Sequence, residues 1–218
     1  RHLLEGINTL AGEVVTFHST YQRWRPKQPA NWRWDSATPG CGLLCDLGPH
    51  LVMQAVELFG LPKSLTCITR SQRGSGVDDC FLLVLHYPER PDLLVQLDAS
   101  CLVASALLQG SRVITVHGRS GTFQKSGIDP QEADLIAGKT PSHAPEWGRE
   151  PDSQAATFTS VNEQGAARSE MLPIVPGNYL IYYEGIRDAI SGKAVAPPIL
   201  ATDARNVMVI LEAAASSA

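Results

Sequence analysis

The sequence predicts an α+β domain built on an open, mostly antiparallel β-sheet that is backed by helices. Strand-like segments follow one another along the chain and are not interleaved with helices, as a parallel doubly wound sheet would require. No strand leads into a Gly-x-Gly-x-x-Gly turn, the pattern that holds a dinucleotide pyrophosphate. With 218 residues, 44% of them apolar, the chain is long enough to bury a substantial core.

The chain opens with a helix-like stretch followed by a long strand. Apolar residues spaced by three and four from Leu3 to Leu10 predict the helix. Because no N-cap precedes it and the first residue is Arg1, we expect the sequence to be a piece of a longer polypeptide. Residues 13–25 are rich in β-branched and aromatic side chains and predict a strand, and the Pro-, Trp- and Asn-rich residues 26–40 predict a loop.

The stretch from Pro39 to Gly60 predicts an amphipathic helix. Its apolar residues recur at spacings of three and four: Leu44, Leu47, Leu51, Ala55 and Leu58. Pro49 leaves two interpretations open. Either the helix begins near Gly48, with the proline in its first turn, or it begins near Gly42 and bends at the proline.

Asp46 and His50 lie four residues apart in this stretch, so on a helix their side chains share one face. Both interpretations of the helix start keep the two residues close together. General acid–base chemistry uses a carboxylate and an imidazole placed in this way. The same spacing also fits a surface helix with an incidental Asp–His pair, and spacing alone does not separate the two.

The remaining elements follow in a simple order. They are strands over 63–71, 79–87, 93–102 and 111–117, a glycine turn at 117–121 that leads into another strand, a helix at 130–138, strands over 156–161 and 167–172, and helices over 178–191 and 202–216. The run from Phe81 to Leu85 is apolar without alternation, so both faces of its sheet should be covered. We expect helices on one face and a second copy of the chain on the other, giving a homodimer through the sheet face.

Composition narrows the range of partners. The net charge is −4 and no basic cluster is interleaved with aromatic residues, so nucleic acid is not expected. No apolar run approaches the ~20 residues of a membrane span and no signal peptide is visible, so we expect a cytoplasmic protein without a membrane partner. Five cysteines, an odd number, suggest reduced thiols. Cys41, Cys45 and His50 have a weak metal-ligand spacing, and we expect no metal.

Taken together, these stretches resemble a known family. The chain is similar to the C-terminal domain of the glucose–fructose oxidoreductase / inositol dehydrogenase / rhizopine-catabolism (Gfo/Idh/MocA) family of NAD(P)-dependent oxidoreductases. The most specific element is Asp-x-Gly-x-His at 46–50. The matching stretches cover nearly the whole chain: LLEGINTLAGEVVTFHSTYQRWRP, GCGLLCDLGPHLVMQAVELFGLPKSL, VDDCFLLVLHYP, RVITVHGRSGTFQKSGIDPQEADLIAG, NYLIYYEGIRDAI and ATDARNVMVILEAA.

The resemblance implies a fold like the C-terminal domain of glyceraldehyde-3-phosphate dehydrogenase. It implies that residues 1–218 form one substrate-binding and dimerisation domain, and that an N-terminal Rossmann domain, absent from this chain, binds NAD or NADP. No cofactor contact is then expected here beyond the surroundings of Asp46. The implied reaction moves a hydride between a hydroxyl carbon of a sugar-like or polyol substrate and nicotinamide.

The resemblance also assigns roles to single residues. It implies that His50 takes the hydroxyl proton and that Asp46 orients His50 or binds a substrate hydroxyl. Trp32, Arg33 and Gly42 are candidates for substrate binding, and the alternative for the tryptophan is that it pins its loop to the core, the commoner use of such residues. The family's lysine, in a Glu-Lys-Pro element of the Rossmann domain, has no counterpart in these 218 residues, so we expect the chain alone to be inactive.

Two positions depart from the family pattern. Gly40-Cys41-Gly42 stands where relatives often have three glycines, and Met53 stands where relatives commonly have an acid. These departures bear on the substrate class more than on the chemistry. A non-catalytic dimerisation or ligand-binding scaffold therefore remains the alternative to an enzyme.

Overall fold

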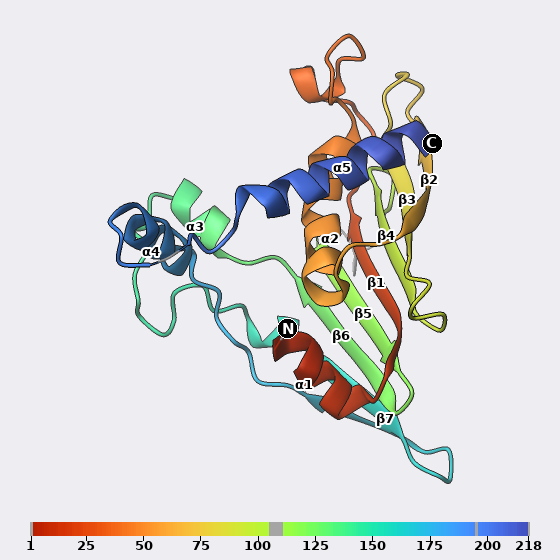
Figure 1. The fold of residues 1–218 in the computed structure, drawn as a ribbon, viewed down its shortest axis with the longest axis vertical. Helices are drawn as coiled ribbons and strands as arrows, with labels where there is room; N and C mark the ends of the chain where they lie inside the picture. The colour runs from red at the N-terminus through yellow and green to blue at the C-terminus, as the bar shows by residue number, and fades with distance from the viewer. Residues whose placement is uncertain (1, 105–110, 195, 218) are drawn as a thin grey trace.

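A mostly antiparallel β-sheet forms the centre of the molecule (Figure 1). The computed structural model describes residues 2–104, 111–194 and 196–217, without the side chains of residues 2–5, 7 and 111. The strands are β1 (Val14–Gln22), β2 (Ser64–Arg70), β3 (Cys80–His86), β4 (Leu94–Ser100), β5 (Ser111–Gly118), β6 (Gly121–Gly127), β7 (Thr157–Val161) and β8 (Ala167–Met171). Their order in the sheet is β2-β3-β4-β1-β5-β6-β7-β8.

The described strand pairs confirm the predicted fold class. The β1–β4 pair is parallel, and the other neighbouring strands are antiparallel. The turns predicted at 74–76, 88–91 and 117–121 join β2 to β3, β3 to β4 and β5 to β6. The strand boundaries after β1 lie within about two residues of their predicted positions, and β1 ends at Gln22, three residues before the predicted end.

The helices cover one face of this sheet. They are α1 (His2–Ala11), α2 (Leu43–Phe59), α3 (Gln131–Ile136), α4 (Tyr179–Ile190) and α5 (Ala201–Ser217), with 3₁₀ turns η1 (Trp32–Trp34) and η2 (Asp152–Gln154). Helix α2 packs over β4 and its neighbours, and α5 packs against both α2 and β2 (Figure 1). Helices α3 and α4 stand to one side of the sheet.

Helix α2 begins at Leu43, with Gly42 as its N-cap, and continues through Pro49 to Phe59. The start near Gly42 is therefore the correct one of the two alternatives. Gly60 ends the helix as predicted, with its N–H donating to the carbonyl of Val56. The face of α2 turned to the sheet supplies much of the core: Leu43, Leu44, Leu47, Leu51, Val52 and Ala55 are buried.

A residue distant in sequence caps the start of α2. The backbone N–H groups of Leu43 and Leu44 donate to the carbonyl (2.9 Å) and carboxylate (2.7 Å) oxygens of Asp78. The first turn of a helix has N–H groups without intrahelical acceptors, and Asp78 satisfies two of them. Gly42 has a φ of 96°, and a Cβ added there would lie 1.8 Å from Oδ1 of Asp78. Only glycine allows this close approach.

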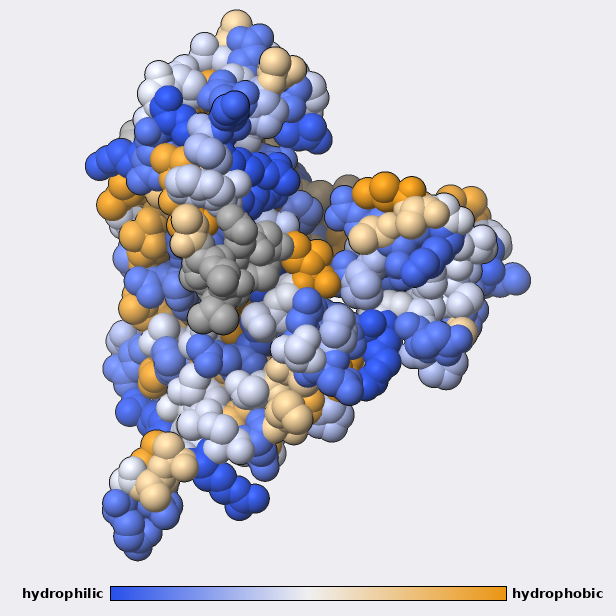
Figure 2. All heavy atoms as spheres, turned by 180° about the vertical axis from the view of Figure 1, so that it is seen from behind, coloured by the Kyte–Doolittle hydropathy of each residue, from blue (hydrophilic) through white to orange (hydrophobic). Residues whose placement is uncertain are grey.

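The opposite face of the sheet carries no described helix. In β3, Phe81, Leu83 and Leu85 are buried whereas Leu82 is 36% exposed, so burial alternates even though the sequence does not. Figure 2 views the molecule from this side and shows hydrophobic side chains scattered among hydrophilic ones. Within the described chain this face is open.

Candidate functional site

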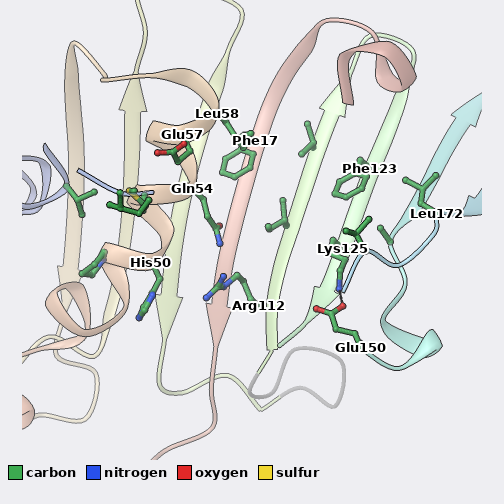
Figure 3. A pocket seen from close by; sticks show the side chains of 18 of the residues that line it. Phe17, His50, Gln54, Glu57, Leu58, Arg112, Phe123, Lys125, Glu150 and Leu172 are labelled. Atoms are coloured by element: carbon green, nitrogen blue, oxygen red, sulfur yellow. Dashed lines mark hydrogen bonds and ion pairs between the residues drawn. The ribbon is translucent and has the colours of Figure 1, made fainter. Parts of the chain in front are cut away.

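Two adjoining cavities lie between α2 and the helix-covered face of the sheet. The first, of about 600 Å³, is polar. Its lining includes Tyr21, Arg23, Asp46, His50, Arg112, Lys125, Asp129, Glu132, Glu150 and Tyr179. The second, of about 1000 Å³, is mainly apolar and is shown in Figure 3. Both cavities share His50, Arg112, Ile114, Lys125 and Glu150, so the polar site opens beside an apolar space.

His50 lies where the two cavities meet. It follows Asp46 by one turn of α2, and both residues line the polar cavity. The side chain still reaches solvent, yet partial burial of the ring lowers the pKa of His50, and the Arg112 guanidinium lowers it further. The Asp46 carboxylate opposes this effect. An imidazole with a lowered pKa is neutral at neutral pH and can accept a proton.

Asp46 is held by two arginines. Its Oδ2 lies 3.6 Å from Nη1 of Arg23, and its Oδ1 lies 3.3 Å from Nε of Arg33. Its place in the first turn of α2 also suits a negative charge, because the helix dipole is positive at that end. No hydrogen bond joins Asp46 to His50 within the described residues, so in this structure Asp46 acts on His50 through its charge.

The other predicted site residues lie outside both cavities. Arg33 reaches Asp46, with its guanidinium 4.7 Å from the ring centre of Trp32, which is 56% exposed. Gly42 donates a 2.7 Å hydrogen bond to the carbonyl of Arg33 and faces Asp78. Trp34, by contrast, is buried and pins the loop to the core. The structure thus brings the Arg33 side chain to Asp46, while Gly42 meets Asp46 only through the backbone, its carbonyl accepting from the N–H of Asp46 (3.0 Å).

Sequence reasoning missed the charged residues on the sheet. Arg112 on β5 and Lys125 on β6 project from the helix-covered face, in the same alternation as Ile114, Val116 and Phe123. A charged residue at a strand position that should face the core was the available signal. The pairing of distant segments that brings these residues to His50 could not be read from spacing.

The described residues offer no cluster of three or more His, Cys, Asp or Glu side chains that could hold a metal ion. Cys41 and Cys45 are free thiols. None of the described helices is both long enough and apolar enough to cross a membrane.

The start of α2 does not fit the phosphates of a dinucleotide. Phosphates bind at helix N-termini that have free N–H groups. Here the Asp78 carboxylate already accepts from Leu44, and its charge would repel a phosphate. The described part of the chain therefore provides a polar cavity beside α2 and no phosphate cradle at the start of this helix.

A family model described as the GFO/IDH/MocA C-terminal domain matches residues 8–124, more than half of the chain. The chain belongs to this family. The match confirms the resemblance identified from the Asp-x-Gly-x-His element and the surrounding stretches.

Relatives of this GFO/IDH/MocA domain are oxidoreductases by name. The uncharacterized oxidoreductase YdgJ of Escherichia coli is 38% identical over 99% of this chain and 58% of its own length. The scyllo-inositol 2-dehydrogenase (NADP(+)) IolW of Bacillus subtilis is 33% identical over 94% of this chain and 54% of its own length. The solved structure of yvaA from Bacillus subtilis superposes with a TM-score of 0.85 at 32% identity, covering 99% of this chain and 59% of that one. The chain thus spans little more than half of these relatives.

Proposed function

We propose that this chain is the substrate-side domain of an NAD(P)-dependent oxidoreductase that acts on a hydroxyl carbon of a sugar-like or polyol substrate. The observation that carries the proposal is the Asp46–His50 pair at the cavity, with His50 kept neutral by its surroundings and therefore able to act as a base. The identity to a scyllo-inositol 2-dehydrogenase supports a polyol substrate. In this proposal NAD or NADP is bound mainly by an N-terminal domain of the longer protein.

His50, Asp46 and the two arginines beside Asp46 each have a part in the proposed reaction. The substrate hydroxyl faces His50, which takes its proton as the carbinol carbon becomes a carbonyl carbon. Asp46 carries a negative charge that favours the imidazolium formed in this step, and Arg23 and Arg33 hold the carboxylate in place. A bound nicotinamide would supply the hydride acceptor. A lysine from the N-terminal domain would stabilise the developing alkoxide.

The test is a screen of sugars and polyols with NAD⁺ and NADP⁺, following the reduced cofactor by absorbance. We expect turnover by the full-length protein that contains this chain and none by the 218-residue chain alone. Turnover by the chain alone would contradict the assignment of cofactor binding to another domain. If the full-length protein turns over no sugar or polyol, the scaffold alternative is favoured.

We also propose that the open sheet face forms a homodimer. Ile68, Leu82 and Leu94, on neighbouring strands of that face, are 44%, 36% and 42% exposed, which is apolar area that a second copy would remove from water. Sedimentation velocity of the full-length protein at tens of micromolar should show a dimer, and Leu82→Arg should shift it to a monomer. A strictly monomeric wild type, or a Leu82→Arg dimer, would count against this interface.

A further inference from the structure

Among the described residues three basic side chains line the polar cavity, and Arg112 is the one of them without a described partner. Lys125 donates to the Glu150 carboxylate and, at 2.9 Å each, to the carbonyls of Ser126 and Gln154. Arg23 lies beside Asp46. No hydrogen bond or ion pair from the described residues engages the Arg112 guanidinium, and its Nε is buried without an acceptor.

The surroundings of Arg112 leave room for a ligand. Across the sheet it pairs with Tyr21 on β1 and with Gly127 on β6, and the glycine adds no side chain on that flank. Figure 3 shows Arg112 and His50 at the same end of the cavity, from the sheet and from α2, while a dashed line joins Lys125 to Glu150. A group bound by Arg112 would therefore lie next to the base.

A guanidinium whose Nε is buried without an acceptor is costly unless something completes it. Arginine presents a planar fork of N–H donors that matches a carboxylate or phosphate with two parallel hydrogen bonds. The carboxylates already in the cavity do not fill this role. Asp129 accepts from Gln131, and Glu132 makes no ion pair with Arg112.

We propose that Arg112 binds an anionic substituent, a carboxylate or a phosphate, on the substrate whose hydroxyl faces His50. This inference rests on the proposed function and narrows its substrate class from sugar-like or polyol compounds in general to sugar acids or sugar phosphates. Glu132 lines the same cavity and disfavours an anion near itself, so the anionic group sits on the Arg112 side. Glu132 is then available to accept hydrogen bonds from substrate hydroxyls.

Isothermal titration calorimetry of the full-length protein tests the proposal with three probes that share one sugar ring: D-glucose, D-glucuronate and D-glucose 6-phosphate. At least one anionic probe should bind 10-fold or more tightly than glucose. Arg112→Gln should remove that advantage, and Arg112→Lys, which keeps the charge without the fork, should retain part of it. Preference for glucuronate identifies a carboxylate, and preference for the phosphate ester identifies a phosphate.

Arg119→Gln is the matched control. Arg119 lies on the same β5–β6 hairpin, outside both cavities, where it pairs with Glu13 and Asp92, and its substitution removes the same charge. It should leave the affinity for all three probes unchanged. Thermal unfolding of each variant shows whether the protein is still folded when binding is lost.

The opposite outcomes overturn the proposal. The proposal fails if glucose binds as tightly as the anionic probes or more tightly, or if neither anionic probe binds. It also fails if Arg119→Gln weakens binding of the anionic probes as much as Arg112→Gln does, or if Arg112→Gln loses NADP binding and still binds the anionic probes. Because binding is measured without turnover, the outcome is separate from that of the proposed function. An anion-binding protein that oxidises no sugar would support the Arg112 site and contradict the dehydrogenase.

Discussion

Charges close to His50 decide what its imidazole can do. Burial and Arg112 favour the neutral ring, and Asp46 favours the protonated ring. An anionic substituent bound to Arg112 would cancel one of the influences that lower the pKa of His50. The base would then become stronger as the substrate binds, which links the specificity proposed for Arg112 to the chemistry proposed for His50.

Gly42 is a residue whose backbone conformation and surroundings both require glycine. Its φ of 96° and ψ of 169° lie in a region that only glycine adopts readily. Gly42→Ala should destabilise the protein by about 2 kcal/mol or more, since backbone strain of ~1–3 kcal/mol is added to a clash with the Asp78 carboxylate. Thermal unfolding of the full-length protein measures the loss.

Gly40→Ala is the control for this prediction. Gly40 has a φ of 77°, but a Cβ added there meets nothing within 4 Å. Gly40→Ala should therefore destabilise the protein only by the backbone strain. Equal destabilisation by the two substitutions would show that the approach to Asp78 is unimportant.

Helix α2 depends on a cap supplied by a loop 34 residues further along the chain. Burial raises the pKa of Asp78, although the N–H of Leu44 opposes this by favouring the carboxylate. Since the buried charge is costly and the acceptor oxygen is useful, a neutral acceptor should serve as well. Asp78→Ala should cost about 1 kcal/mol, as for the loss of a helix cap, and Asp78→Asn should cost less. Asparagine as harmful as alanine in thermal unfolding would refute this explanation.

Elements with strong periodicity could be predicted from the sequence. The apolar stripe from Leu44 to Ala55 predicts which face of α2 is buried, and the four-residue spacing of Asp46 and His50 predicts that they share a face. The Asp78 cap and the Arg112–His50 neighbourhood could not be predicted, because they arise where segments far apart in sequence pack together. Gly42 shows the limit most clearly: the sequence suggests a substrate-binding glycine there, and the structure places the Asp78 carboxylate beside it.

The sheet as a whole carries a pH-sensitive pair on its open face. The hydrogen bond that the His18 ring donates to the Asp98 carboxylate raises the pKa of His18, with burial opposing it. A raised histidine pKa stabilises the fold fully below the unfolded value of about 6.5, and this stabilisation is lost as the pH rises through the folded value. The unfolding temperature of wild type should therefore exceed that of His18→Gln by more at pH 6 than at pH 8.

Asp98→Asn gives the complementary test, because it removes the charge that raises the pKa of His18. The unfolding temperature of wild type should likewise exceed that of Asp98→Asn by more at pH 6 than at pH 8, because this variant also lacks the pH-dependent stabilisation. A difference between wild type and His18→Gln that is independent of pH would contradict the role assigned to the pair. If the open face is a dimer interface, the same pair lies within it.

The most direct test of the account is the rate of His50→Ala in the full-length protein, with the substrate found by the screen. We expect kcat/KM to fall by roughly 10²–10⁴-fold, the usual contribution of a general base, with cofactor affinity little changed. The acid limb of the wild-type pH profile should lie below the ordinary histidine pKa of about 6.5 and be lost in the variant. His117→Ala, on the open face, should keep the wild-type rate. Near-full activity of His50→Ala would place the base elsewhere and contradict the central claim.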